Sequence, residues 1–137
     1  MPMAPVETMT TCLADLGTLE PGLQLVILFG SAATQRMRPG SDVDVAVLAD
    51  GPADVDALYR ILAPRLRTDR LDLVDLRRGG PLLAFEVARH GRPLFERDPG
   101  GFRTFQALAS RRYCDTAKLR RAQERAIRVF LERHGLA

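Results

Sequence analysis

A glycine–serine pair followed at a fixed distance by two aspartates most constrains how this chain folds. Gly30-Ser31 is separated by ten residues from Asp42-Val43-Asp44. A glycine turn that opens a helix presents backbone N–H groups, which bind phosphate oxygens. Two aspartates two positions apart on a strand point to the same face of a sheet, and paired carboxylates bind the hard cations that accompany triphosphates. An isolated Asp-x-Asp is more typical of a solvated edge strand, but the ordered combination predicts a nucleotide and metal site.

The spacing of apolar residues predicts a sheet flanked by helices. Strands are expected over residues 23–29, 42–48, 71–76 and 92–96. Helices are expected over residues 6–19, 53–66 and 81–90, with a short helix after Ser31 and Gly91 as a C-cap. A helical tail is expected to begin at Asp98-Pro99, with aspartate as N-cap, and to stop at His134-Gly135. Asp115-Thr116 would cap a new helix there or mark a kink.

The third strand offers two further carboxylates, Asp72 and Asp75. They are three positions apart, so they face opposite ways on a regular strand. Asp72 lies in an otherwise core-like run, and a carboxylate there needs a partner, which a cation shared with Asp42 and Asp44 would supply. Asp75 lies nearer the strand end, where solvent or a turn would satisfy it. We therefore prefer Asp72 as the third metal ligand and keep Asp75 as the alternative.

The length and charge of the chain limit what it can contain. Its 137 residues suit one domain, with a core over 1–98 and a helical segment over 99–137. The net charge of +3 is uneven, because the segment from Phe102 onward holds nine basic and three acidic residues. A basic tail suits phosphates or an acidic protein partner. Nucleic acid ranks last, because no aromatic residues are interleaved with the arginines in the manner of a binding motif.

The location expected for the chain is the cytoplasm, with no membrane association. Two cysteines form no disulfide framework, the N-terminus lacks a basic signal-peptide region, and the longest apolar run is too short to cross a bilayer. Two apolar stripes follow the tail. The first holds Phe102, Phe105, Ala109 and Tyr113, and the second holds Leu119, Ala122, Ala126, Val129 and Phe130. Both are expected to be packing surface, with a partner groove as the alternative for the end of the second.

These residues together resemble the nucleotidyltransferases of DNA polymerase beta type, and more narrowly the minimal, MntA-like antitoxins. The resemblance rests on Gly30-Ser31-x10-Asp42-x-Asp44 and on the run 71–76, and softer matches over 81–87, 91–98 and 115–121 extend it along nearly the whole chain. It implies an α/β (α+β) nucleotidyltransferase fold, with a small mixed sheet flanked by helices and a long C-terminal helical segment. It also implies ATP as substrate and two Mg²⁺ ions.

The resemblance further implies a partner and roles for individual residues. Family members transfer AMP to a tyrosine of a HEPN-type ribonuclease toxin, commonly encoded beside them, so a hetero-oligomer with that toxin is expected. Asp42, Asp44 and Asp72 would be the catalytic and metal-binding residues. The nucleotide would be bound by Gly30, Ser31, Arg36 and Ser41. Members often have Arg-Gly where this chain has Thr34-Gln35, so Arg36 would supply the arginine.

Two other functions remain open from the sequence. A non-catalytic antitoxin would block its toxin by contact alone, and the Thr34-Gln35 departure keeps this alternative in view. A small-molecule nucleotidyltransferase, such as one that modifies an antibiotic, would need additional sequence to build a substrate pocket. A chain of 137 residues leaves little room for it.

Overall fold

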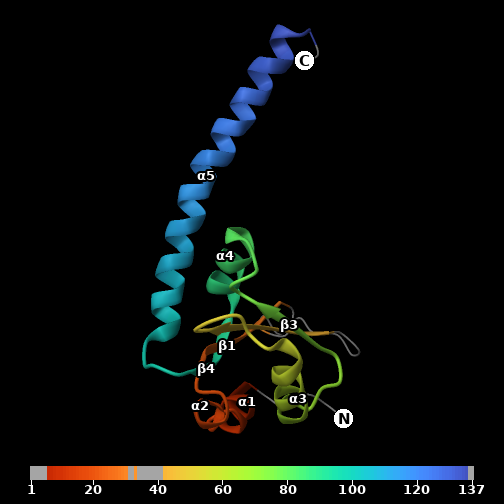
Figure 1. Cartoon of the computed structure of the whole chain (residues 1–137), viewed down its shortest axis with the longest axis vertical. Coiled ribbons are helices and arrows are strands. Elements are labelled where there is room, and N and C mark those ends of the chain that lie inside the picture. Colours follow the sequence, from red (N-terminus) through yellow and green to blue (C-terminus); the bar gives the residue numbers. More distant parts are fainter. Residues whose placement is uncertain (1–5, 31–32, 34–41, 136–137) are drawn as a thin grey trace.

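The fold of the chain is a four-stranded mixed sheet with helices on both faces, seen in a computed structural model (Figure 1). The structure describes residues 6–30, 33 and 42–135. The strands are β1 (Leu23–Phe29), β2 (Val43–Ala49), β3 (Leu71–Asp75) and β4 (Arg92–Glu96), in the order β3-β2-β1-β4. β1 is antiparallel to β2 and to β4, whereas β2 and β3 are parallel. All four expected strands are present, and this arrangement confirms the predicted small mixed sheet.

The first face of the sheet is covered by α1 (Val6–Cys12), α2 (Leu16–Leu19) and α3 (Val55–Leu66). The three helices bury Met9, Leu16 and Leu62 against alternate residues of the strands, such as Val45 and Val47. The expected single helix over 6–19 is wrong, because a turn interrupts it after Cys12. The turn lets Leu13 and Leu16 both reach the core.

Helix α3 forms the crossover that connects the parallel strands β2 and β3, and local interactions cap both of its ends. The Asp54 carboxylate accepts a hydrogen bond from the Ala57 N–H at 3.1 Å, which satisfies one donor of the first turn. Arg67 ends the helix in a left-handed conformation with φ of 54°. The crossover places β3 beside β2, so the starts of these two parallel strands lie at the same edge of the sheet.

The second face of the sheet carries α4 (Pro81–His90) and the foot of α5 (Gly101–Arg133). Val87 and Phe102 pack there against Ile27 and Ala46. Gly91 is the C-cap of α4, as expected, and its N–H donates to the Val87 carbonyl, with φ of −75° in the extended region. A Cβ at this position would overlap the Val87 carbonyl and the Ile27 side chain, so glycine lets the chain pass close to β1.

Helix α5 begins later than expected and runs without a break. Gly100, with φ of 82°, is its N-cap, and the Glu96 carboxylate accepts from the Phe102 N–H at 3.0 Å. The expected Asp98-Pro99 start is therefore wrong, because a carboxylate from β4 caps the helix in place of Asp98. A new helix or kink at Asp115-Thr116 is also wrong, since the Thr116 hydroxyl donates to the Tyr113 carbonyl within a continuous helix.

The end of α5 matches the expected stop, with His134 as C-cap and Gly135 at φ of 65°. Its 33 residues span about 50 Å at 1.5 Å per residue, and Figure 1 shows its second half extending well beyond the sheet. Within the described ranges, none of the helices has the length and apolar content that a bilayer-spanning segment requires.

Candidate active site

The three predicted carboxylates gather at one edge of the sheet, where β1 ends and β2 and β3 begin. Asp44 pairs with Phe29 of β1 on one side and with Asp72 of β3 on the other. Asp42 directly precedes β2. Because Val43 and Val45 point into the first core cluster, Asp44 points to the opposite face, which is the face that carries α4.

The electrostatics of the site follow from this register. Asp44 is half-buried, and Asp42 and Asp72 are exposed. Burial raises the pKa of the Asp44 carboxyl above its ordinary value, and the negative charges of Asp72 and Asp42 raise that pKa further. The register of the parallel strands sets Asp72 beside Asp44, and Asp42 lies two residues before Asp44.

Gly30 forms the wall of the site beside Asp44. Its φ of 72° lies in the left-handed region, which side chains other than glycine rarely adopt. A Cβ at this position would overlap the Asp44 carboxylate. Glycine is therefore required twice here, once by the backbone turn after β1 and once by the close approach of that turn to the carboxylate.

The chemistry of these donors fits a hard divalent cation. Carboxylate oxygens are the ligands that Mg²⁺ prefers, and a cation would neutralise the like charges that raise the pKa of Asp44. As they stand, no three histidine, cysteine, aspartate or glutamate side chains in residues 6–30, 33 and 42–135 form a group that could hold a metal ion. The fit therefore rests on donor chemistry and mutual charge.

Asp75 has a different role from Asp72. It is only 6% exposed, and its partner in β2 is Val47 on the opposite face of the sheet. One carboxylate oxygen accepts from the Ala53 N–H at 3.1 Å and the other from the Arg77 N–H at 3.0 Å. Asp75 thus joins the loops that follow β2 and β3, and its side chain lies away from Asp44.

Three predicted nucleotide ligands, Ser31, Arg36 and Ser41, lie outside the described residues. The Thr34-Gln35 departure and the expected short helix after Ser31 lie there too.

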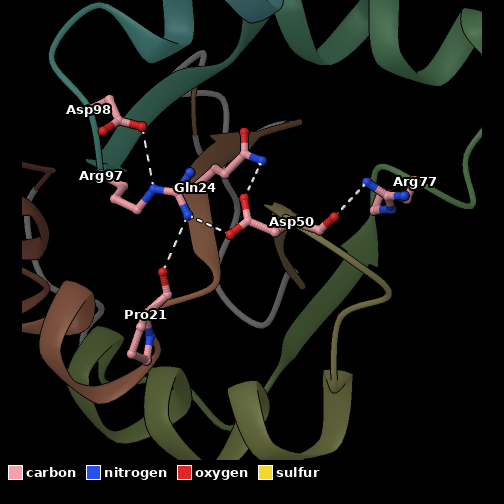
Figure 2. Close-up of polar contacts among 6 residues, drawn as sticks. All are labelled: Pro21, Gln24, Asp50, Arg77, Arg97 and Asp98. Atoms are coloured by element: carbon pink, nitrogen blue, oxygen red, sulfur yellow. Dashed lines mark hydrogen bonds and ion pairs between the residues drawn. The ribbon is translucent and has the colours of Figure 1, made fainter.

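The sequence analysis missed a polar network at the opposite end of the strands, shown in Figure 2. The Asp50 carboxylate accepts from Arg97 at 2.8 Å and from Gln24 at 2.8 Å, and the Asp50 carbonyl accepts from Arg77 at 3.1 Å. The hydrogen bonds from Arg97 and Gln24 hold the pKa of Asp50 below its ordinary value. The spacing of residues in the sequence does not indicate this network, because its members come from four separate segments that only the fold brings together.

Known proteins are similar to this chain in sequence and in fold. The family model described as polymerase beta, nucleotidyltransferase matches residues 14–100. A protein adenylyltransferase MntA of Aphanizomenon flos-aquae (strain 2012/KM1/D3) is 30% identical over 128 residues, with 85% of each chain covered. A crystal structure of a toxin-antitoxin with AMP-PNP matches with a TM-score of 0.70 and 28% identity, over 90% of this chain and 98% of that chain.

A third match is the structure of a tri-AMPylated Shewanella oneidensis HEPN toxin in complex with its MNT antitoxin. It has a TM-score of 0.65 and 27% identity, and it covers 90% of this chain and 98% of that chain. The two solved structures each cover 90% of this chain, and the family model includes all four strands of the sheet.

Proposed function

The chain belongs to the nucleotidyltransferases of polymerase beta type, within their MntA-like group, and from this premise we propose that it is an AMP-transferring antitoxin. Its substrate is ATP, and its target is a tyrosine of a HEPN-type toxin with which it forms a hetero-oligomer. Related toxin–antitoxin structures that contain an ATP analogue and an AMPylated toxin support this proposal. The observation that carries it is the pairing of Asp44 with Asp72 beside the Gly30 turn.

The carboxylates bind the metal, in this proposal as two Mg²⁺ ions. Asp42 and Asp44 would hold the ion that accompanies the triphosphate, and Asp72 would contribute to holding the second ion. When bound, the ions supply charge neutralisation for the phosphate oxygens. A cation bound there would offset the two effects that raise the pKa of Asp44, its burial and the negative charges of Asp72 and Asp42.

The remaining steps belong to the chain and its substrates. Gly30 and Ser31 hold the β- and γ-phosphates, and Arg36 and Ser41 contribute further nucleotide contacts. Asp72 accepts the proton of the toxin's hydroxyl group. The hydroxyl oxygen then attacks the α-phosphorus in line, a new bond to the toxin forms, and the bond to pyrophosphate breaks. Pyrophosphate leaves, and AMP remains on the toxin. The protein acts by positioning and by placing charge, as in phosphoryl transfer generally.

The test is transfer of label from α-³²P-ATP, with Mg²⁺, to the HEPN-type protein encoded beside this chain. We expect Asp42→Asn and Asp72→Asn each to lower the initial rate by about 10²–10⁴-fold, because each removes a charge that acts in the transition state. Asp56→Asn is the matched control, since Asp56 is an exposed aspartate in the first turn of α3, on the opposite face of the sheet. That variant is expected to retain the wild-type rate.

Three outcomes contradict the proposal. Full transfer by Asp42→Asn would remove the carboxylates from the mechanism. Stoichiometric inhibition of the toxin without any label would make the chain a contact inhibitor. Label that appears only on a small molecule would place the chain among small-molecule nucleotidyltransferases.

A further inference from the structure

The second half of α5 packs against no other element of the described chain. Its first half is held against α4, where the Tyr113 ring stacks on Phe85 with centroids 4.1 Å apart and the Gln106 side chain donates to the Ala88 carbonyl at 2.9 Å. The guanidinium of Arg120 lies 4.9 Å from the centre of the Tyr113 ring and marks the end of this contact. From residue 118 to residue 130 every side chain is exposed.

One side of this exposed half is apolar. Leu119, Ala122, Ala126 and Phe130 follow one another at intervals of three and four residues, so they line a single side of the helix. Leu119 is 58% and Phe130 is 55% exposed. The opposite side carries charged residues, including Arg121 and Arg128. An amphipathic helix stabilises itself by burying its apolar side, so this side, the α5 stripe, lacks a surface to pack on within the described chain.

The α5 stripe leads down to a cavity at the foot of the helix. The cavity has a volume of about 400 Å³ and lies between the sheet, α4 and α5. From α5 it is lined by Leu108 and Arg112, and from the sheet by Leu48 and Leu76. Leu108 precedes Leu119 by eleven residues, which is three turns, so the cavity opens on the same side of α5 as the stripe. Cavity and stripe therefore lie on one side of α5, with the charged side chains of Arg112 and Asp115 between them.

The charge around this surface indicates the kind of partner that binds it. Between Arg111 and Arg133 the helix holds eight basic and three acidic residues. Two copies of this segment laid side by side would repel each other, whereas a segment with acidic residues beside its apolar side would be attracted. The solved toxin–antitoxin with AMP-PNP covers 90% of this chain, and the unmatched tenth is less than half the length of α5. At least half of α5 therefore has a counterpart in a protein that forms a toxin complex.

We propose that the α5 stripe and the cavity at its foot dock an amphipathic helix of the toxin, with apolar residues along its contact side and acidic residues at its edges. This inference rests on the proposed function for the identity of the partner. The toxin helix lies along Leu119 to Phe130, and a large apolar side chain near its end enters the cavity beside Leu108. Arg112 and Lys118, which border this surface, pair with the acidic edge.

The test measures the affinity of the full chain for the HEPN-type protein encoded beside it, at 0.15 M salt. We expect Leu119→Ser with Phe130→Ser to weaken binding at least about 30-fold, because together they remove the two large apolar side chains of the stripe. Leu19→Ser is the apolar control, because Leu19 is 47% exposed on α2 at the opposite face of the sheet. Arg128→Ser is the control for the charged side of α5. Both controls are expected to change the affinity less than about threefold.

A second double variant distinguishes a loss of docking from a loss of helix stability. Ala122→Arg with Ala126→Arg adds bulk to the contact side while retaining helix formers, so it blocks docking without weakening the helix. Unchanged affinity in both double variants would overturn the proposal. Equal losses in the double variants and the controls would also overturn it. So would a homodimer, seen by light scattering, that the double variants dissociate while toxin affinity stays unchanged.

Failure of docking and failure of AMP transfer are separable. Asp42→Asn is expected to bind the toxin with wild-type affinity while its rate of label transfer falls by about 10²–10⁴-fold. Leu119→Ser with Phe130→Ser is expected to transfer label at the wild-type maximal rate once toxin is saturating, with a raised KM for toxin. If the wild-type chain transfers no label and yet loses affinity through the double variant, the docking surface stands and the proposed enzyme activity does not.

Discussion

Gly30 is the single residue whose replacement most directly tests the shape of the site. With φ of 72° and the Asp44 carboxylate where a Cβ would lie, Gly30→Ala strains the backbone and displaces the carboxylate. We expect a loss of about 1–3 kcal/mol in the free energy of unfolding, measured by urea denaturation, and a loss of AMP transfer. Gly51→Ala is the matched control, because a Cβ there meets nothing within 4 Å. Equal stability of the two variants would contradict this account of the turn.

The negative charge of Asp44 lowers the stability of the folded chain. Because its pKa is raised in the folded chain, the folded state binds this proton more tightly than the unfolded state does. The stability linked to that proton is present at low pH and is lost as pH rises through the raised pKa. Asp44→Asn, in EDTA, is therefore expected to raise the free energy of unfolding at pH 7 by about 0.2–1 kcal/mol, the scale of facing like charges.

The same pH dependence provides the check on Asp44. The advantage of Asp44→Asn is expected to vanish near pH 3, where the carboxyl is protonated in both states. Thermal melts at both pH values, with and without Mg²⁺, test the expectation. Added Mg²⁺ should raise the Tm of the wild-type chain and leave that of the variant unchanged. A variant that is less stable than wild type at pH 7 in EDTA would show that Asp44 has a favourable partner in the fold.

At the scale of the elements, β3 carries both the proposed catalytic aspartate, Asp72, and a structural aspartate, Asp75. Asp75→Ala leaves the Ala53 and Arg77 N–H groups without their buried acceptor, so it is expected to cost about 2–3 kcal/mol in unfolding free energy. The folded fraction should still transfer AMP. Asp72→Ala is expected to show the reverse, with stability near wild type and transfer lost. Denaturation curves and transfer rates for both variants decide this, and loss of transfer in Asp75→Ala at full folding would reverse the assignment.

Local sequence patterns predicted where most of the helices and strands lie. The alternation of aspartate and valine at the start of 42–48 identified β2, because its valines enter the core while Asp44 points to the other face. In 71–76, Leu71 and Leu73 join the same core while Asp72 is exposed. The capping of α5 was not predictable, since Glu96 of β4 replaces the expected Asp98. The ion pair at the other end of the strands was not predictable from the sequence either. Asp50 and Arg97 are 47 positions apart and meet only because β1 lies between their strands.

The candidate site was predictable for a specific reason. The even spacing of Asp42 and Asp44 on a strand fixes their common face, and the odd spacing of Asp72 and Asp75 separates them. The register that sets Asp44 against Asp72 was not in the sequence pattern, because it depends on the length of the crossover through α3. The shape of the Gly30 turn needed tertiary context too, since only the approach of Asp44 explains why a side chain is excluded there.

Across the whole molecule, the aspartates and the proposed docking surface share one face of the sheet. Asp44 and Leu48 are both on the α4 face of β2, four residues apart, which is about 13 Å along a strand. A toxin that enters the cavity beside Leu48 therefore reaches the sheet on the side where AMP transfer is proposed. In these proposals, the acidic part of the chain before Phe102 binds cations and nucleotide, and the basic segment after it binds the acidic partner.

The free half of α5 should be the least protected helix of the molecule until its partner binds. A helix that packs on nothing gains little beyond its own hydrogen bonds, and isolated helices of this length are marginal in water. We expect the amides of residues 118–130 to exchange with solvent at least about 100-fold faster than those of β1, measured by hydrogen–deuterium exchange. Addition of the HEPN-type toxin should slow exchange in 118–130 by a similar factor.

Nucleotide provides the control for this exchange experiment. ATP with Mg²⁺, added without toxin, should slow exchange around Gly30 and Asp44 and leave 118–130 unchanged, because the two regions lie at separate parts of the fold (Figure 1). Slow exchange in 118–130 of the free, monomeric chain would mean that the helix is stabilised from within and needs no partner. Protection there by toxin, absent in Leu119→Ser with Phe130→Ser, would place the contact on the α5 stripe, because each amide reports its own helical turn.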